Sequence, residues 1–385
     1  MRPPESCGIK MLFCAALRRC PGRGWPALSR RQLHFTPADR KTFAQDGFIL
    51  KQNVISPADA AVLAAHYEEL FAGNFPTGVY PDEWHWRAGI SLPTAVREIV
   101  NGWKATPAVA RIALAPSLGR AAAELLDWSA GTRVAQDDVL WKPAGAGGVG
   151  YHTDAAYISD QFVPRDDNSV TVWIALDDAD AETGTVEYAV GSHRWRDAAG
   201  TDRTSASASD FHGADDVAAP VFAAAARAGI AESEVVLRSV AVPAGAAIFH
   251  HQDVWHGSGP NTHATRPRRA LAVHLLRRDV HFRATPPPDY IYGRYVARAG
   301  ASEVSDTFFP VTWTPPSASS ELAARGDVVI ELTRCGLMVD EEVDGDARDS
   351  PTLIRAWAGR GGDGSDEPHD ALAHMLEAWR SVARS

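Results

Sequence analysis

The sequence contains little cysteine, and most of it lies at one end. Only four of the 385 residues are cysteines, and Cys7, Cys14 and Cys20 fall within the first 35 residues. Residues 36–385 contain a single cysteine, Cys335, so neither a disulfide framework nor a cysteine metal site is expected there. This usage is typical of a protein in a reducing compartment.

Long apolar runs and basic stretches are also missing. No segment approaches the roughly 18 consecutive apolar residues that a membrane-spanning helix needs, so we expect no membrane span. The total charge is −10, and because residues 1–35 carry +6, the remainder carries −16. Such an acidic chain, with no interleaved basic and aromatic residues, argues against nucleic acid as the partner. The expected partner is a small-molecule substrate, and nothing in the sequence predicts the oligomeric state.

The first 35 residues have a composition of their own. They contain seven basic residues against the single acid Glu5, with short apolar pieces such as "MLFCAAL" between them. This composition predicts a mitochondrial transit peptide that ends near "SRRQLHF", and therefore a mitochondrial matrix location. The alternative is a disordered leader on a cytoplasmic protein.

Residues 36–130 predict a mainly helical region. The stretches "TPADRKTFAQD" and "SPADAAVLAAHYEELF" each predict a helix, with Thr36 and Ser56 as N-caps and a proline in the first turn. A short strand, "GFILKQ", lies between them. Further helices are expected around "AVREIVNGW" and "SLGRAAAELLDW".

Residues 131–285 predict β structure. Short β-rich runs such as "SVTVWIALDDA" and "RRALAVHLLRR" are separated by glycine and proline turns, without helices at the spacing of β-α-β units. This pattern favours an antiparallel barrel or sandwich of the jelly-roll kind, mainly β with flanking helices. We assign residues 36–345 to one domain, and residues 346–385 to a linker and an amphipathic C-terminal helix.

The stretch "GYHTDAAYI" places two metal-binding side chains two residues apart. In a strand His152 and Asp154 would project from the same face, so both could bind one ion. A third ligand is available from His256 in "HHQDVWHGSGPN". Two histidines and one carboxylate form the facial triad that holds non-heme Fe(II) with open coordination positions. His250 and His251 are adjacent, so at least one of them must point away from such a site.

An arginine follows the third ligand in "RPRRALAVHLL". Period two places Arg268, Ala270, Ala272 and His274 on one face of the strand, and Arg269 on the other. Small residues beside one buried cation suit a pocket for a dicarboxylate, which a guanidinium grips with two hydrogen bonds. His274 is interpreted as a buried core histidine.

Several stretches in this order resemble the phytanoyl-CoA dioxygenase family of Fe(II)/2-oxoglutarate-dependent oxygenases. They are "WKPAGAGGVGYHTDAAYI", "VTVWIALDDADAETGTVEYAVGSH", "VPAGAAIFHHQDVWHGSGPN" and "RPRRALAVHLL", and the resemblance covers about residues 38–281. It implies a double-stranded β-helix core, cupin-like, with Fe(II), 2-oxoglutarate and O2 as cofactor and cosubstrates. It also implies hydroxylation with release of succinate and CO2, because halogenating relatives carry a small residue where this sequence has Asp154.

The resemblance also implies residue roles. The iron ligands would be His152, Asp154 and His256, and Arg268 would bind the distal carboxylate of 2-oxoglutarate, with Arg266 as the alternative anchor. The other residues implied for the 2-oxoglutarate pocket are Ser258, Trp173 and Lys142. Candidate substrate contacts are Trp84, Trp86, Arg97, Tyr157 and Glu187.

Two other functions fit part of these observations. A jelly-roll protein with a structural metal and no turnover would have no use for a buried arginine beside the site. A zinc hydrolase could use the same three ligands, but it too would leave Arg268 unexplained.

Overall fold

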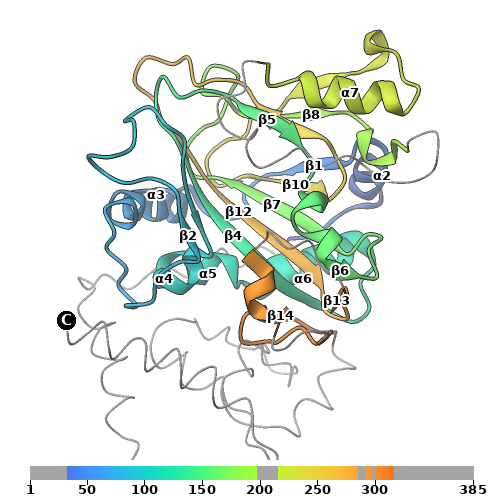
Figure 1. The fold of residues 1–385 in the computed structure, drawn as a ribbon, viewed down its shortest axis with the longest axis horizontal. Helices are drawn as coiled ribbons and strands as arrows, with labels where there is room; N and C mark the ends of the chain where they lie inside the picture. The colour runs from blue at the N-terminus through green and yellow to red at the C-terminus, as the bar shows by residue number, and fades with distance from the viewer. Residues whose placement is uncertain (1–32, 197–215, 285–290, 297–300, 316–385) are drawn as a thin grey trace, which may run out of the picture.

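The structure is a computed structural model that describes residues 33–196, 216–284, 291–296 and 301–315 (Figure 1). The predicted transit peptide lies almost entirely outside these residues, as do the predicted C-terminal linker and helix. Within the described residues, no helix is long and apolar enough to cross a membrane.

An eight-stranded antiparallel sheet forms the larger layer of the fold. Its strands follow the order β1-β10-β7-β12-β4-β3-β2, and β14 also pairs with β4. The long central strands β4 and β12 run side by side across the middle of Figure 1. The strands are β1 (Phe48–Lys51), β2 (Glu83–Trp84), β3 (Arg97–Val100), β4 (Thr132–Lys142), β7 (Ser169–Ala175), β10 (Ala247–His251), β12 (Arg268–Arg277) and β14 (Val311–Trp313).

A four-stranded antiparallel sheet, in the order β5-β11-β8-β9, forms the second layer. A core cluster joins the two sheets: Trp173 and Ala272 from the larger sheet pack with Val186 and Tyr188 from the smaller one. This arrangement is the predicted jelly roll. The smaller sheet contains β5 (Val149–His152), β8 (Val186–Ala189), β9 (Leu237–Ser239) and β11 (His256–Ser258), and a separate pair is formed by β6 (Phe162–Val163) and β13 (His281–Phe282).

Helices cover the outer face of each sheet. The outer face of the larger sheet buries Val139, Val172 and Leu271 against α3, α5 and α6, and α7 packs beside β5 on the smaller sheet (Figure 1). The helices are α2 (Pro37–Asp46), α3 (Pro57–Phe71), α4 (Gly102–Ala105), α5 (Pro107–Ala113), α6 (Pro116–Leu126) and α7 (Ala219–Arg227). Short 3-10 turns are η1 (Asp154–Ala156), η2 (Ser159–Gln161), η3 (Ser192–Arg194), η5 (Glu232–Glu234) and η6 (Ile291–Tyr295).

The helix starts follow the predicted caps. The Thr36 hydroxyl accepts from the Asp39 backbone N–H at 3.2 Å, and Ser56 does the same for Asp59 at 3.0 Å. Each cap satisfies a backbone donor that the first helical turn leaves without an intrahelical partner.

The segment "AVREIVNGW" differs from its prediction. Arg97–Val100 is strand β3 rather than helix, and only Gly102–Ala105 is helical. The strand pairs with β4 along its full length and buries Ile99 and Val100. Four residues are too few to show a helical or a strand period, so the available edge of β4 decides the conformation.

Candidate metal and 2-oxoglutarate site

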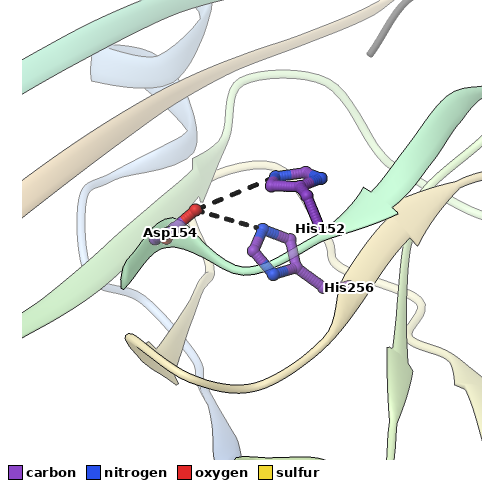
Figure 2. Close-up of side chains that lie close together, drawn as sticks. All are labelled: His152, Asp154 and His256. Atoms are coloured by element: carbon purple, nitrogen blue, oxygen red, sulfur yellow. Dashed lines mark ion pairs between the residues drawn. The ribbon is translucent and has the colours of Figure 1, made fainter. Parts of the chain in front are cut away.

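Three side chains meet where β5 and β11 lie side by side (Figure 2). His152 ends β5 and pairs with His256, the first residue of β11. Asp154 Oδ1 lies 3.5 Å from His256 Nε2 and 3.8 Å from His152 Nε2. All three side chains are buried, and one ligand atom of each lies within 4.8 Å of the others.

Asp154 reaches this cluster from a turn rather than from the strand that the two-residue spacing suggested. Strand β5 ends at His152, and Asp154 is the first residue of the 3-10 turn η1. Thr153 between them is extended, so both side chains still reach the same side of the chain.

Each histidine of the cluster has its Nε2 atom available to bind a metal. His152 Nδ1 lies 2.8 Å from the Gly150 carbonyl, and His256 Nδ1 lies 3.0 Å from the Val254 carbonyl. Because a carbonyl only accepts, each Nδ1 carries a proton, which leaves Nε2, the atom that faces Asp154, as the one available to a metal. Burial and the neighbouring His256 lower the pKa of His152 to about 3, which keeps it a neutral ligand.

The Asp154 carboxyl is ionised. Burial alone would raise its pKa, but His256, a hydrogen bond involving His250, and His274 together hold the pKa well below its usual value. Two imidazole nitrogens and one carboxylate oxygen on one side of a buried point are the donor set of a facial Fe(II) triad. The residues present therefore fit an iron ion.

Arg268 lies on the inner face of the larger sheet. Its side chain is 4% exposed, and its Nε has no hydrogen-bond partner among the described residues. Its guanidinium carbon lies 5.3 Å from the centre of the Trp173 ring. Burial lowers its pKa to about 10, so the group stays charged near neutral pH. An unpaired buried cation is costly unless an anion joins it, and the carboxylate of 2-oxoglutarate fits this requirement.

Lys142 and Ser258 lie next to this arginine. Lys142 pairs with Arg268 across β4 and β12, and its Nζ donates to Ser258 Oγ at 2.7 Å and to the Gly259 carbonyl. Burial and the nearby Arg268 lower the pKa of Lys142 to about 6. The four predicted residues of the 2-oxoglutarate pocket, Arg268, Ser258, Trp173 and Lys142, thus lie together.

Arg266, the alternative anchor, lies elsewhere. Its side chain is 42% exposed and pairs with Asp180 at 2.9 Å. The geometry therefore favours Arg268 as the arginine of the pocket.

The predicted substrate contacts separate into two groups. The Tyr157 ring lies 6.3 Å from the His152 ring, at the edge of the metal cluster. Arg97 instead pairs with Trp141 on the opposite face of the sheet from Lys142, and its guanidinium stacks between the Trp86 and Trp141 rings. Trp84 packs with these residues against the helices.

Glu187 also points away from the triad. Its neighbour Tyr188 faces the core between the sheets, so Glu187 projects from the other face of β8. There it accepts from Ser239 and lies 3.4 Å from the Tyr151 hydroxyl.

The sequence interpretation missed a set of polar residues around Asp154. Thr171 and His250 both contact its Oδ2, and His274 bridges Thr171 to Asp138. Period two placed His274 on the correct face, but nothing in the sequence indicated that Thr171 or Asp138 would be its partner.

A jelly roll with a buried His–Asp–His cluster and a buried arginine on its inner face has the features of the non-heme Fe(II)- and 2-oxoglutarate-dependent oxygenases. The phytanoyl-CoA dioxygenase (PhyH) family profile matches residues 43–270, more than half of the chain. The chain belongs to this family. It is a 2-oxoglutarate-dependent dioxygenase that uses Fe(II), 2-oxoglutarate and O2.

Solved structures show the same fold. The non-heme, alpha-ketoglutarate-dependent carbocyclase SnoK from nogalamycin biosynthesis is 22% identical, with a TM-score of 0.54 over 72% of this chain and 96% of its own. The epimerase SnoN, in complex with Fe3+, alpha-ketoglutarate and nogalamycin RO, is 19% identical, with a TM-score of 0.51 and coverages of 71% and 97%. EctD from S. alaskensis is 17% identical, with a TM-score of 0.50 and coverages of 70% and 84%. No curated protein is similar enough in sequence to count as a relative.

Proposed function

We propose that the enzyme hydroxylates a small organic or acyl substrate and couples this reaction to the conversion of 2-oxoglutarate to succinate and CO2. One observation carries the proposal: a buried arginine, whose Nε has no hydrogen-bond partner among the described residues, lies on the inner face of the jelly roll, which also carries a buried His–Asp–His cluster. Neither a structural metal site nor a zinc hydrolase site needs that arginine.

The chain's own residues have distinct roles in this reaction. Arg268 binds the distal carboxylate of 2-oxoglutarate through two charge-assisted hydrogen bonds, and Ser258 adds a hydroxyl to the same carboxylate. Trp173 forms a wall of the pocket and excludes water from the buried cation. His152, Asp154 and His256 would hold Fe(II), which when bound supplies the oxidative chemistry that activates O2 against the substrate C–H bond.

The carboxylate at position 154 favours hydroxylation among the oxidations open to such a site. With iron bound, Asp154 would take a coordination position that a halogenating enzyme needs for a halide ion. Its ionised state and its two contacts through Oδ2 support a permanent ligand role.

Succinate release in the presence of a substrate library tests this function. Purified protein with Fe(II), ascorbate, 2-oxoglutarate and air should release succinate faster with a true substrate, and mass spectrometry should show a product with one added oxygen atom. Hydrolysis products with Zn(II), and no succinate with any compound, would support the hydrolase instead. Tight metal binding with no 2-oxoglutarate binding would support the non-catalytic protein.

We also propose that residues 1–35 direct the enzyme to the mitochondrial matrix, because they combine seven basic residues with one acid. Fusion of these residues to a fluorescent protein should give mitochondrial import, whereas a fusion that remains cytosolic would contradict the proposal.

A further inference from the structure

Two buried donors converge on the same oxygen of Asp154. The Thr171 hydroxyl donates to Oδ2, and His250 Nε2 lies 2.9 Å from that oxygen. Thr171 on β7 and His250 on β10 are direct cross-strand partners, so the two donors lie side by side on the inner face of the sheet. Because an ionised carboxylate only accepts, His250 donates from Nε2. Two protein groups therefore occupy Oδ2.

The other oxygen of the same carboxylate has a different environment. Asp154 Oδ1 faces His256 Nε2 at 3.5 Å and His152 Nε2 at 3.8 Å, the two nitrogens that would ligate the metal. Rotation of the carboxylate to offer both oxygens to one ion would pull Oδ2 away from Thr171 and His250. Both of those buried groups would then lose their partner, which is costly for a buried donor.

The donors are themselves held by buried partners. Tyr188 is fully buried, and its hydroxyl lies 2.9 Å from His250 Nδ1. On the other side, His274 Nδ1 lies 2.7 Å from the Thr171 hydroxyl, and His274 Nε2 lies 2.7 Å from Asp138 Oδ2. These groups belong to strands of the two sheets, β4, β7, β8, β10 and β12, so the position of Asp154 is fixed by the sheets as well as by its own turn.

We propose that Thr171 and His250 are positioning residues that keep Asp154 bound to the metal through Oδ1 alone. This inference rests on the proposed function, because it concerns the iron site of that reaction. A carboxylate restricted to a single oxygen leaves the remaining coordination positions to the cosubstrates. Tyr188 orients His250, and His274, whose Nδ1 also lies 3.6 Å from Oδ2, orients Thr171.

The test compares three variants of buried threonines, with Co(II) as a spectroscopic probe of the site. Thr171→Val keeps the shape of the side chain but removes the donor, and Thr171→Ser keeps the donor. Thr132→Val is the matched control, because Thr132 is equally buried but its hydroxyl donates to the Gly119 carbonyl at 2.8 Å, away from the triad. Calorimetry measures the Co(II) dissociation constant, and visible absorption measures the ligand geometry.

We expect Thr171→Val to raise the Co(II) dissociation constant by about ten- to hundredfold, the range typical of lost partners of metal ligands, and to change the shape of the visible spectrum. Thr171→Ser should restore both values to within roughly threefold, and Thr132→Val should change neither. If Thr171 served packing alone, Thr171→Val, which keeps its shape, would leave the Co(II) affinity and the spectrum unchanged, and Thr171→Ser, which loses a methyl group, would lower thermal stability.

The outcomes separate the inference from the function that it rests on. A wild-type protein that binds neither Co(II) nor 2-oxoglutarate would contradict the proposed function. A wild type that binds both, with a folded Thr171→Val variant of unchanged affinity and spectrum, would overturn the inference alone. If Thr171→Val does not fold, His250→Leu removes the other donor to the same oxygen, and unchanged Co(II) binding in that variant is equally decisive against it.

Discussion

The two faces of the eight-stranded sheet use the same kinds of residues for different purposes. Arg268 and Arg269 are neighbours on β12, yet Arg269 forms two hydrogen bonds with Asp177, at 2.7 and 2.8 Å, on the face that the helices cover. Arg268 faces the interior, where its Nε has no partner among the described residues. The pairing with Asp177 raises the pKa of Arg269, whereas burial lowers that of Arg268 to about 10. Arg97 Nε on the outer face also lacks a partner, but its guanidinium stacks between two tryptophan rings. Arg268 differs from both Arg97 and Arg269, because it is a buried cation with no carboxylate partner among the described residues, and this indicates a binding site for an anion.

The outer and inner faces of the sheet also differ in what surrounds their tryptophans. On the outer face Trp86 and Trp141 enclose the Arg97 guanidinium, whose carbon lies 4.1 and 4.2 Å from their ring centres. On the inner face Trp173 lies beside Arg268 and the small residue Ala272. Large rings fill the space under the helices, whereas on the inner face the alanines of β7 and β12 pack with Trp173.

The largest expected effect comes from the metal ligands on the inner side. His152→Ala, Asp154→Ala and His256→Ala should each abolish iron-dependent turnover, because the site loses a third of its ligand set. The fold should persist in His152→Ala and His256→Ala, because each ring bonds a backbone carbonyl two residues away. Asp154→Ala should also lose stability, because it leaves Thr171 and His250 without their acceptor. Succinate release measures turnover, and circular dichroism measures folding. A variant with full activity at matched iron occupancy would show that the substituted residue is not a metal ligand.

The two neighbouring arginines give the next largest contrast. Arg268→Leu should weaken 2-oxoglutarate binding by roughly two orders of magnitude, because two charge-assisted hydrogen bonds are lost. Fe(II) binding should stay nearly intact, since no metal ligand changes. Arg269→Leu, its matched control, should lower stability and leave 2-oxoglutarate affinity within about twofold. Calorimetric titration of the Mn(II)-loaded variants measures both 2-oxoglutarate affinities. An equal loss of affinity in the two variants would contradict the different roles of the two faces.

The buried Lys142 predicts a pH dependence of stability. Its pKa is about 6 in the folded protein, whereas an unfolded lysine titrates near pH 10.4. Between these values the unfolded chain binds one more proton, so the free energy of unfolding rises with pH, by on the order of 1 kcal/mol per pH unit. Below about pH 6 both states are protonated and this contribution to the slope vanishes.

Urea denaturation of the metal-free protein and of Lys142→Met, at pH 7 and above, isolates this effect. The wild type should gain stability relative to the variant as the pH rises. Parallel stability curves would show that Lys142 keeps its proton in the folded state.

The smallest effect is expected on the outer face. Arg97→Leu removes two stacking contacts with tryptophan rings and should cost about 1–2 kcal/mol of stability. Turnover and the KM for the substrate should change little, because the side chain faces away from the triad. A large rise in substrate KM, without loss of stability, would instead support the substrate contact that the sequence suggested for Arg97.

The sequence predicts the inner face well where several signals point to one site. The two-residue spacing of His152 and Asp154, the distant His256 and the period-two pattern after Arg268 each place a side chain, and together they define one site. Capping residues such as Thr36 likewise locate helix starts, because a cap is a local interaction that the chain carries within four residues.

The rest depends on contacts between distant segments. Trp84 and Arg97 belong to two- and four-residue strands, and Trp86 follows the first of these outside any strand, so no period shows which face meets the metal. The pairing of β3 with β4 decides which face of the sheet Arg97 occupies. The polar partners of Asp154 are equally non-local, since Thr171 and His250 come from strands that meet only in the folded sheet.

Anaerobic titration of the iron-loaded enzyme with 2-oxoglutarate tests the central claim most directly. The Fe(II) chelate of a 2-oxo acid has a visible charge-transfer band, so binding at the triad can be followed without turnover. We predict a saturable band in the wild type and in Arg269→Leu, and in Arg268→Leu a band that requires roughly a hundredfold more 2-oxoglutarate. A fully iron-loaded wild type that develops no band at any concentration would contradict the assignment of this site to Fe(II) and 2-oxoglutarate.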